Sequence, residues 1–196
     1  MSKIEVNEIV NQSGDNDSGI DLTTNDQIGF KIANASKWTL NSSGNLFPAS
    51  TSQGIVLGAT SDTSANRLED YEEGTWTPSL GGNTTYHNQA GKYTKIGRTV
   101  HASAVIQANS LGTGSTTTVS GFPFTHVSAG GGNMNGSVGF FYFLAVNVIS
   151  LELYFSNSVT STAFKGLTSA SNISSSNLAI FGDGARVDFS VTYETS

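Results

Sequence analysis

The chain has 196 residues, of which only 12% are charged, against about 25% in an average globular protein. It contains no cysteine, which excludes a disulfide framework, a thiolate metal site and a cysteine nucleophile. The net charge of −6 argues against binding to the phosphate backbone of nucleic acids. Ser, Thr, Asn and Gly together make up 89 residues, and these small polar residues favour strands and turns over helices. The composition therefore predicts an all-β protein.

The first 67 residues contain only short apolar runs with a period of two residues, which is typical of β-strands. One such run consists of Ile28, Phe30 and Ile32. Each run supplies two or three apolar side chains, too few for a segment of this size to close a core alone. Because there is no cysteine and no visible cluster of metal ligands, oligomerisation remains as the means of stabilising the segment. We expect residues 1–67 to form an intertwined shaft in which several copies share their apolar edges.

Two segments bear on targeting and on membranes. The N-terminus alternates polar and apolar residues and lacks the apolar stretch of a Sec signal, so we expect synthesis in the cytoplasm without a signal peptide. The longest apolar stretch, residues 138–155, is interrupted by Gly139, Asn147 and Glu152. A membrane helix needs about 20 apolar residues, so we expect no membrane insertion.

An acidic cluster separates the two halves of the chain. Residues 68–74 hold four carboxylates, Glu69, Asp70, Glu72 and Glu73. We interpret this cluster as a solvated hinge; in an oligomer the carboxylates would meet near one axis, and a cation site there is the alternative. We expect Trp76, directly after the hinge, to pack at the base of the following domain.

Residues 75–196 contain longer apolar runs that indicate about eight strands. Residues 91–106 predict two strands around a turn at Gly97, and residues 138–146 are apolar on both faces, as in a central strand. The last strand alternates an apolar face with a polar one. Its apolar positions are Val187, Phe189, Val191 and Tyr193. This pattern predicts a β-sandwich or jelly roll that folds around its own core.

The residues that usually carry catalysis or metals form no recognisable motif. His87, His101 and His126 have no partner at metal-ligand spacing, and nucleophile and phosphate-binding motifs are missing. A glycosidase needs two carboxylates about 5–9.5 Å apart. The C-terminal half has four, Glu152, Asp183, Asp188 and Glu194. We expect a protein that is not an enzyme and holds no metal or cofactor, with a catalytic carboxylate pair as the alternative.

The C-terminal half carries almost no net charge: residues 74–196 sum to +1, whereas residues 1–73 sum to −7. A neutral ligand such as a glycan therefore fits this half better than a charged one. Asn side chains exchange hydrogen bonds with sugar hydroxyls, and rings cover the C–H face of a sugar. Both occur in Gly-rich loops. The predicted receptor contacts are Tyr86, His87, His126, Asn133 and Asn135, with packing against a neighbouring subunit as the alternative for Tyr86 and His126.

Four segments resemble the tail fibre proteins of phages that infect cyanobacteria and other marine bacteria. Residues 68–78, with the sequence L-E-D-Y-E-E-G-T-W-T-P, match the signature of the fibre domain. Residues 91–97 and 119–124 match two weaker motifs of the same domain, and residues 2–9 are similar to the start of such fibres. Residues 125–185 match no motif, as expected for a variable receptor-facing region.

The resemblance implies a homotrimer on a virion tail. Its N-terminus would bind a tail or baseplate protein, and its C-terminal domain would bind host surface polysaccharide or lipopolysaccharide. The predicted organisation is an N-terminal attachment segment and trimeric shaft (residues 1–67), an acidic hinge (68–74) and a β-sandwich receptor-binding domain (75–196). Two alternatives to this adhesin remain: a tailspike enzyme that degrades polysaccharide, and a purely structural fibre or decoration protein.

Overall fold

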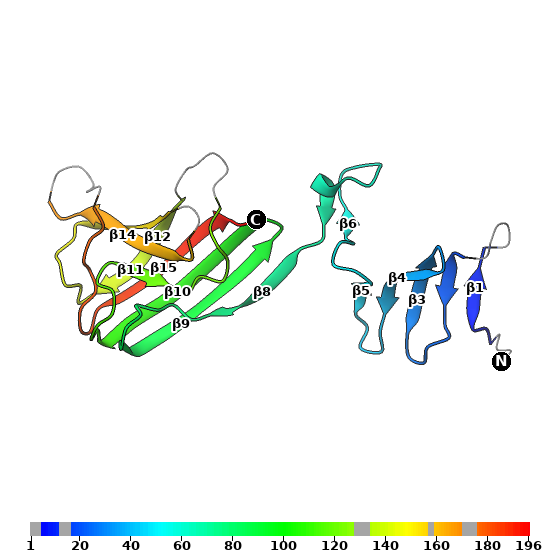
Figure 1. Cartoon of the computed structure of the whole chain (residues 1–196), viewed down its shortest axis with the longest axis horizontal. Helices are drawn as coiled ribbons and strands as arrows, with labels where there is room; N and C mark the ends of the chain where they lie inside the picture. The colour runs from blue at the N-terminus through cyan, green and yellow to red at the C-terminus, as the bar shows by residue number, and fades with distance from the viewer. Residues whose placement is uncertain (1–4, 12–16, 128–133, 157–158, 170–175) are drawn as a thin grey trace. The chain divides into compact units, whose positions relative to one another are not determined.

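The computed structural model describes residues 5–11, 17–127, 134–156, 159–169 and 176–196 (Figure 1). Within these ranges the chain forms β-strands and one short 3₁₀ helix but no α-helix, so the predicted all-β class is confirmed. Contacts divide the chain into two compact units, Met1–Asp70 and Tyr71–Ser196. No helix in the described ranges has the length and apolarity needed to cross a membrane.

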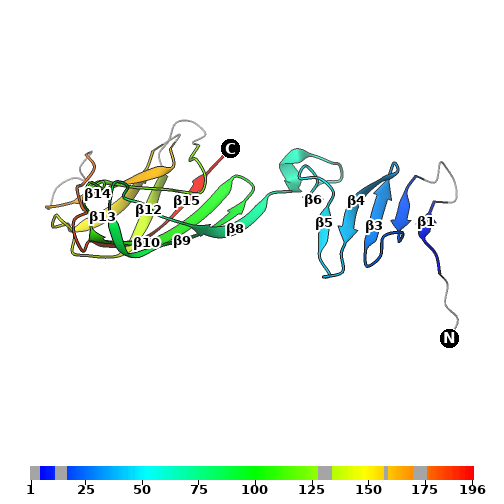
Figure 2. The ribbon, with the colours of Figure 1, turned by 60° about the horizontal axis from the view of Figure 1, so that its bottom comes forward.

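The N-terminal unit is built on a five-stranded antiparallel sheet in which strands adjacent in sequence are adjacent in space (Figure 2). Its strands are β1 (Glu8–Val10), β2 (Gly19–Asp21), β3 (Ile28–Ile32), β4 (Ala35–Leu40) and β5 (Leu46–Pro48). A separate two-stranded sheet follows, formed by β6 (Ile55–Val56) and β7 (Arg67–Leu68), with the 3₁₀ helix η1 (Ser64–Asn66) between them.

The C-terminal unit is one eight-stranded antiparallel sheet with the order β11-β14-β13-β12-β15-β10-β9-β8. The strands are β8 (Tyr71–Trp76), β9 (Thr85–Ile96), β10 (Thr99–Ser110), β11 (Thr118–Ser120), β12 (Met134–Tyr142), β13 (Ser150–Phe155), β14 (Ser161–Leu167) and β15 (Arg186–Glu194). The last strand of the chain therefore lies in the middle of the sheet, between β10 and β12.

This sheet curls until its two ends meet. Phe164 on β14 and Phe189 on β15 stand three strand spacings apart, about 14 Å in a flat sheet, yet their ring centroids are 5.9 Å apart. The edge regions are also joined, because Ser79, just after β8, pairs with Ser120 of β11 through N–H···O bonds of 2.9 and 2.8 Å. One curled sheet thus encloses one core.

Aromatic side chains fill this core. The four apolar positions predicted for the last strand are all buried: Val187, Phe189, Val191 and Tyr193. Trp76 is also buried and its ring stacks on Phe122 with centroids 4.5 Å apart. Gly91 lies under this indole, where a β-carbon would clash with it. Trp76, the last residue of the first strand β8, is thus part of the core of the C-terminal unit.

The acidic segment is ordered differently from the expected hinge. The boundary between the units falls within residues 68–74, but Tyr71–Trp76 pairs with β9 as an edge strand of the sheet. Tyr71 and Tyr93 donate hydroxyl hydrogen bonds to Glu73 and Glu72, respectively. Half of the predicted hinge is therefore part of the C-terminal fold.

Candidate functional site

Two of the predicted receptor contacts have structural partners inside the C-terminal unit. Tyr86 is half-buried, and its hydroxyl accepts a hydrogen bond from the N–H of Leu80 at 2.8 Å. His126 is fully buried; its ring stacks on Phe155 and its Nδ1 donates to the Ser156 carbonyl at 2.8 Å. His126 therefore offers no atom to a ligand at the surface, and its packing partners belong to its own subunit.

The other predicted contacts do not form one site. His87 on β9 and Asn135 on β12 are both exposed, but β10 and β15 lie between their strands in the sheet. Asn133 lies outside the described residues. The structure therefore does not gather these side chains around a common ligand.

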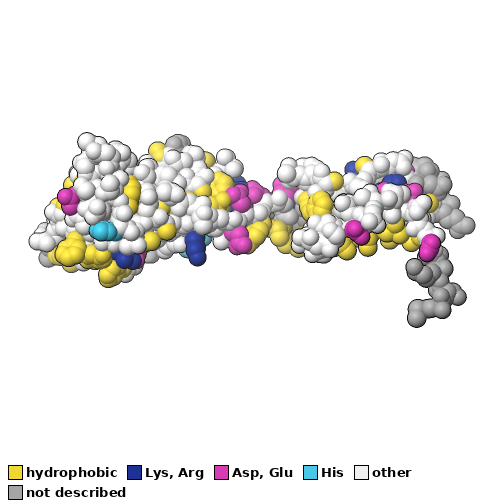
Figure 3. Space-filling view, turned by 90° about the horizontal axis from the view of Figure 1, so that it is seen from below, with side chains coloured by type: hydrophobic (Ala, Val, Ile, Leu, Met, Phe, Trp, Pro, Cys, Tyr) yellow, Lys and Arg dark blue, Asp and Glu magenta, His cyan; other side chains and the backbone are white. Residues whose placement is uncertain are grey.

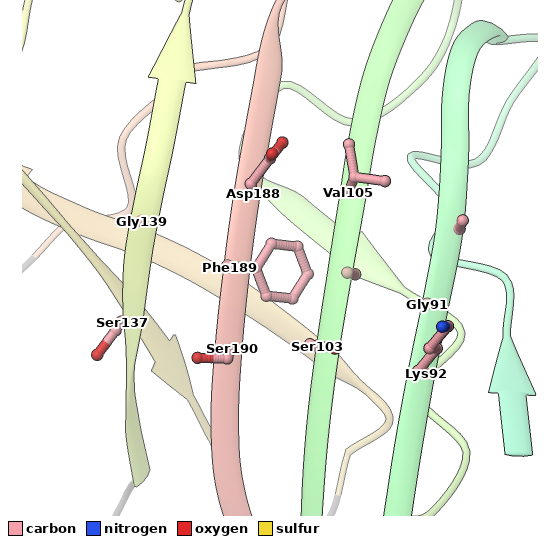
Figure 4. A pocket seen from close by; sticks show the side chains of 11 residues that line it. Gly91, Lys92, Ser103, Val105, Ser137, Gly139, Asp188, Phe189 and Ser190 are labelled. Atoms are coloured by element: carbon pink, nitrogen blue, oxygen red, sulfur yellow. The ribbon is translucent and has the colours of Figure 1, made fainter.

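A groove of about 470 Å³ lies instead on the outer face of the curled sheet, across β9, β10, β15 and β12 (Figure 4). Outward positions on these strands carry small side chains, so Ser103, Ser137 and Ser190 line the groove on three neighbouring strands. Lys92 and Asp188 are its charged lining residues. Its volume is within the range of small-molecule sites, about 300–1,000 Å³.

A second groove of about 450 Å³ shares Lys92 and Ser103 with the first and continues toward β8. Its lining includes Glu73 and His101, whose Nδ1 lies 3.0 Å from the Thr192 hydroxyl. The two grooves therefore adjoin on the outer face, and the surface of the first is mainly apolar, with serine side chains among its lining residues. Alternation along each strand identifies outward positions, but only the register between strands shows that they adjoin.

Beyond this groove, aromatic side chains of β12 are exposed, a feature that the sequence analysis missed. Phe140 is 51% exposed, and Phe143, directly after the strand, is 76% exposed. The expectation that residues 138–146 form a strand buried on both faces is therefore wrong, because nothing among the described residues covers the outward side of β12 here. Strict alternation would put Phe140 on the same face as the inward Val138, but a register shift at Gly139 turns Phe140 to the outer face, opposite Asp188. The glycine inside the apolar run was the one signal of this irregularity.

The N-terminal sheet carries a second candidate surface, an apolar face. Register places the side chains of neighbouring strands in a row across the sheet. This row is Ile9, Ile20, Phe30, Trp38 and Pro48, and Ile28, Leu40 and Leu46 form a second. Phe30 is 41% and Leu46 is 55% exposed, and hydrophobic side chains are visible on the surface of this unit in Figure 3. The opposite face carries charge, with Lys31 paired to Glu8.

Two carboxylates near the unit boundary form ion pairs with an arginine. Arg67 contacts Glu69 at 3.0 Å and Asp62 at 2.6 Å. In the described ranges no three His, Asp or Glu side chains come together in an arrangement suited to a metal ion.

Comparisons with protein-family models, curated proteins and solved structures found no match to this chain. The functional inference therefore rests on the apolar face, on the outer groove and on the sequence resemblance.

Proposed function

We propose that this chain is a subunit of a homotrimeric phage tail fibre, a structural adhesin of the virion that binds polysaccharide or lipopolysaccharide on the host cell. The observation that carries the proposal is the apolar face of the N-terminal sheet, defined as Ile20, Ile28, Phe30, Trp38 and Leu40 with their row neighbours. A fibre subunit needs such a face because its shaft is stabilised between chains.

The energetics favour another copy of the chain as the cover of this face. Buried apolar surface stabilises by roughly 25 cal/mol per Å². A sheet with an apolar face must bury that face against another layer, and the exposed Phe30 and Leu46 show that no described part of this unit covers it. A second and a third copy of the chain would cover this apolar face with apolar faces of their own. The number three comes from the resemblance alone.

The C-terminal unit supplies the receptor-binding part of the proposal. Its net charge near zero and its mainly apolar outer groove, which includes Ser103, Ser137 and Ser190, suit a neutral glycan, which offers hydroxyls and C–H surface instead of charge. A weak site suffices, because three sites on a trimer and several trimers on a virion raise the avidity by orders of magnitude. The N-terminus would bind a tail or baseplate protein, as the resemblance implies.

The test is competition for adsorption. Purified full-length protein is added to host cells before the phage, and free phage is counted after adsorption. We expect adsorption to fall as the protein concentration rises. Undiminished adsorption at saturating protein would contradict the adhesin and favour a purely structural fibre.

The enzyme alternative has its own measurement. Incubation of the protein with host polysaccharide should yield no new reducing ends. Their accumulation with time would overturn the adhesin in favour of a tailspike-type enzyme.

A further inference from the structure

Three aromatic rings follow one another on the outer surface of the C-terminal unit. The ring centroids of Phe140 and Tyr142 are 5.5 Å apart, and those of Tyr142 and Phe143 are 5.1 Å apart. Phe143 has a φ angle of 51°, in the left-handed region that a bulky residue rarely adopts. Strained backbone of this kind concentrates at binding sites. The ring of Phe143 is 76% exposed, so burial of this side chain in the described part of the chain does not explain the strained backbone.

A charged pair on the neighbouring strand fixes this aromatic group. Register on β15 puts Asp188 opposite Phe140 and Arg186 opposite Tyr142. Arg186 donates from Nε and Nη2 to the two carboxylate oxygens of Asp188, both at 2.8 Å, and its guanidinium lies 5.6 Å from the centre of the Phe140 ring. The pair is neutral as a whole and is held rigidly before any ligand arrives.

The group adjoins the outer groove, because Asp188 belongs to both. The groove continues from Asp188 to the hydroxyls of Ser190 and Ser137 (Figure 4). The exposed rings therefore lie beside a guanidinium and a carboxylate, and the carboxylate of Asp188 also lines the groove that contains the serines.

We propose that Phe140, Tyr142, Phe143, Arg186 and Asp188 form an aromatic platform that binds a sugar unit of a neutral polysaccharide. The C–H face of the sugar packs on the rings, as apolar C–H groups do on aromatic faces. Its hydroxyls donate to the Asp188 carboxylate and accept from Arg186, and the rest of the polysaccharide runs along the groove. This inference rests on the proposed adhesin function and names its binding site.

Two other occupants fit the platform less well. An anionic ligand would compete with Asp188 for Arg186, whose charge is already neutralised. A second copy of the chain would bury the Arg186–Asp188 pair, and burial of an ion pair costs desolvation energy that packing against rings does not return. A sugar replaces the water on the pair with its own hydroxyls, so both charged groups keep hydrogen-bond partners.

The test uses the full-length protein on a printed array of purified neutral surface polysaccharides from bacteria. Two variants remove platform groups, Phe143→Ala and Asp188→Asn. The control Ile96→Ala removes a side chain that is 53% exposed at the end of β9, three strands away from β12. We expect the wild type and the control to bind at least one polysaccharide, and each platform variant to bind it about tenfold more weakly or worse. The oligomeric mass of every variant is measured in parallel.

The outcomes separate this site from the function. Weaker binding at unchanged mass supports the platform. Unchanged binding by both variants overturns the platform and leaves the adhesin intact, with its site elsewhere. If a platform variant loses both its oligomeric mass and its polysaccharide binding, the platform proposal is overturned in favour of a subunit interface. If the wild type binds no polysaccharide, both proposals are overturned.

Discussion

At the scale of single residues, the core of the C-terminal unit depends on the fit between Trp76 and Gly91. The indole occupies the space that a β-carbon of residue 91 would need, and its Nε1 donates to the Ser103 carbonyl at 3.2 Å. Gly91→Ala should therefore lower the free energy of unfolding by about 1–3 kcal/mol, the usual cost of overpacking. Chemical denaturation of the full chain measures this difference.

Gly139→Ala is the matched control for that substitution. A β-carbon at Gly139 on β12 would meet only the carbonyl oxygen of Asp188, 4.0 Å away. Its free energy of unfolding should stay within about 0.5 kcal/mol of the wild type. Equal effects of the two substitutions would contradict the packing described for Trp76.

Tyr193 gives the fold a dependence on alkaline pH. Burial raises the pKa of this tyrosine to about 12, whereas an unfolded tyrosine has a pKa of about 10. Between these values the unfolded chain releases the proton while the folded chain keeps it, so stability is full below pH 10 and falls as the pH rises toward 12. The loss should reach about 3 kcal/mol for this group.

Tyr193→Phe isolates this effect. The free energy of unfolding of the variant should fall less steeply than that of the wild type between pH 10 and 12, with the other tyrosines and lysines contributing equally to both. Parallel curves would show that Tyr193 is not protected from solvent.

At the scale of elements, the two faces of the N-terminal sheet should differ in their importance for assembly. Phe30 on the apolar face and Phe47 on the opposite face are nearly equally exposed, at 41% and 43%. Phe30→Ser should weaken the oligomer by at least about tenfold in dissociation constant, whereas Phe47→Ser should leave it nearly unchanged. Analytical ultracentrifugation over a concentration series measures both, and equal effects would mean that the apolar face is not the interface.

Strand β8 makes the start of the C-terminal unit a sharp boundary. A fragment of residues 71–196 keeps the edge strand and Trp76, so it should fold and show the circular dichroism of a β-sheet. A fragment of residues 77–196 lacks both and should melt at a lower temperature. An unfolded 71–196 fragment would contradict the independence of this unit.

The sequence predicted those elements whose pattern is local. The hairpin at residues 91–106 and the alternation in the last strand were correct, because a turn at Gly97 and a period of two are written in consecutive residues. The part of the predicted hinge from Tyr71 to Gly74 belongs to strand β8, which its acidic composition did not indicate. The exposure of Phe140 was missed because an apolar run gives no sign of which face a sheet leaves open.

At the scale of the whole molecule, the division into two units followed from the change in apolar content along the chain, and the structure places the boundary between Asp70 and Tyr71. The order of the eight strands could not be predicted from the sequence, because pairings such as β10 with β15 join residues some 90 positions apart. The groove on the outer face of the sheet was not predicted for the same reason. Ser103, Ser137 and Ser190 become neighbours only through this long-range register.

In the proposed fibre, copies of this chain assemble through the apolar face of the N-terminal sheet. Light scattering of the purified full-length protein at micromolar concentration measures this assembly. We predict one species with three times the chain mass of 20.5 kDa. A stable, folded monomer at that concentration would rule out assembly through this face.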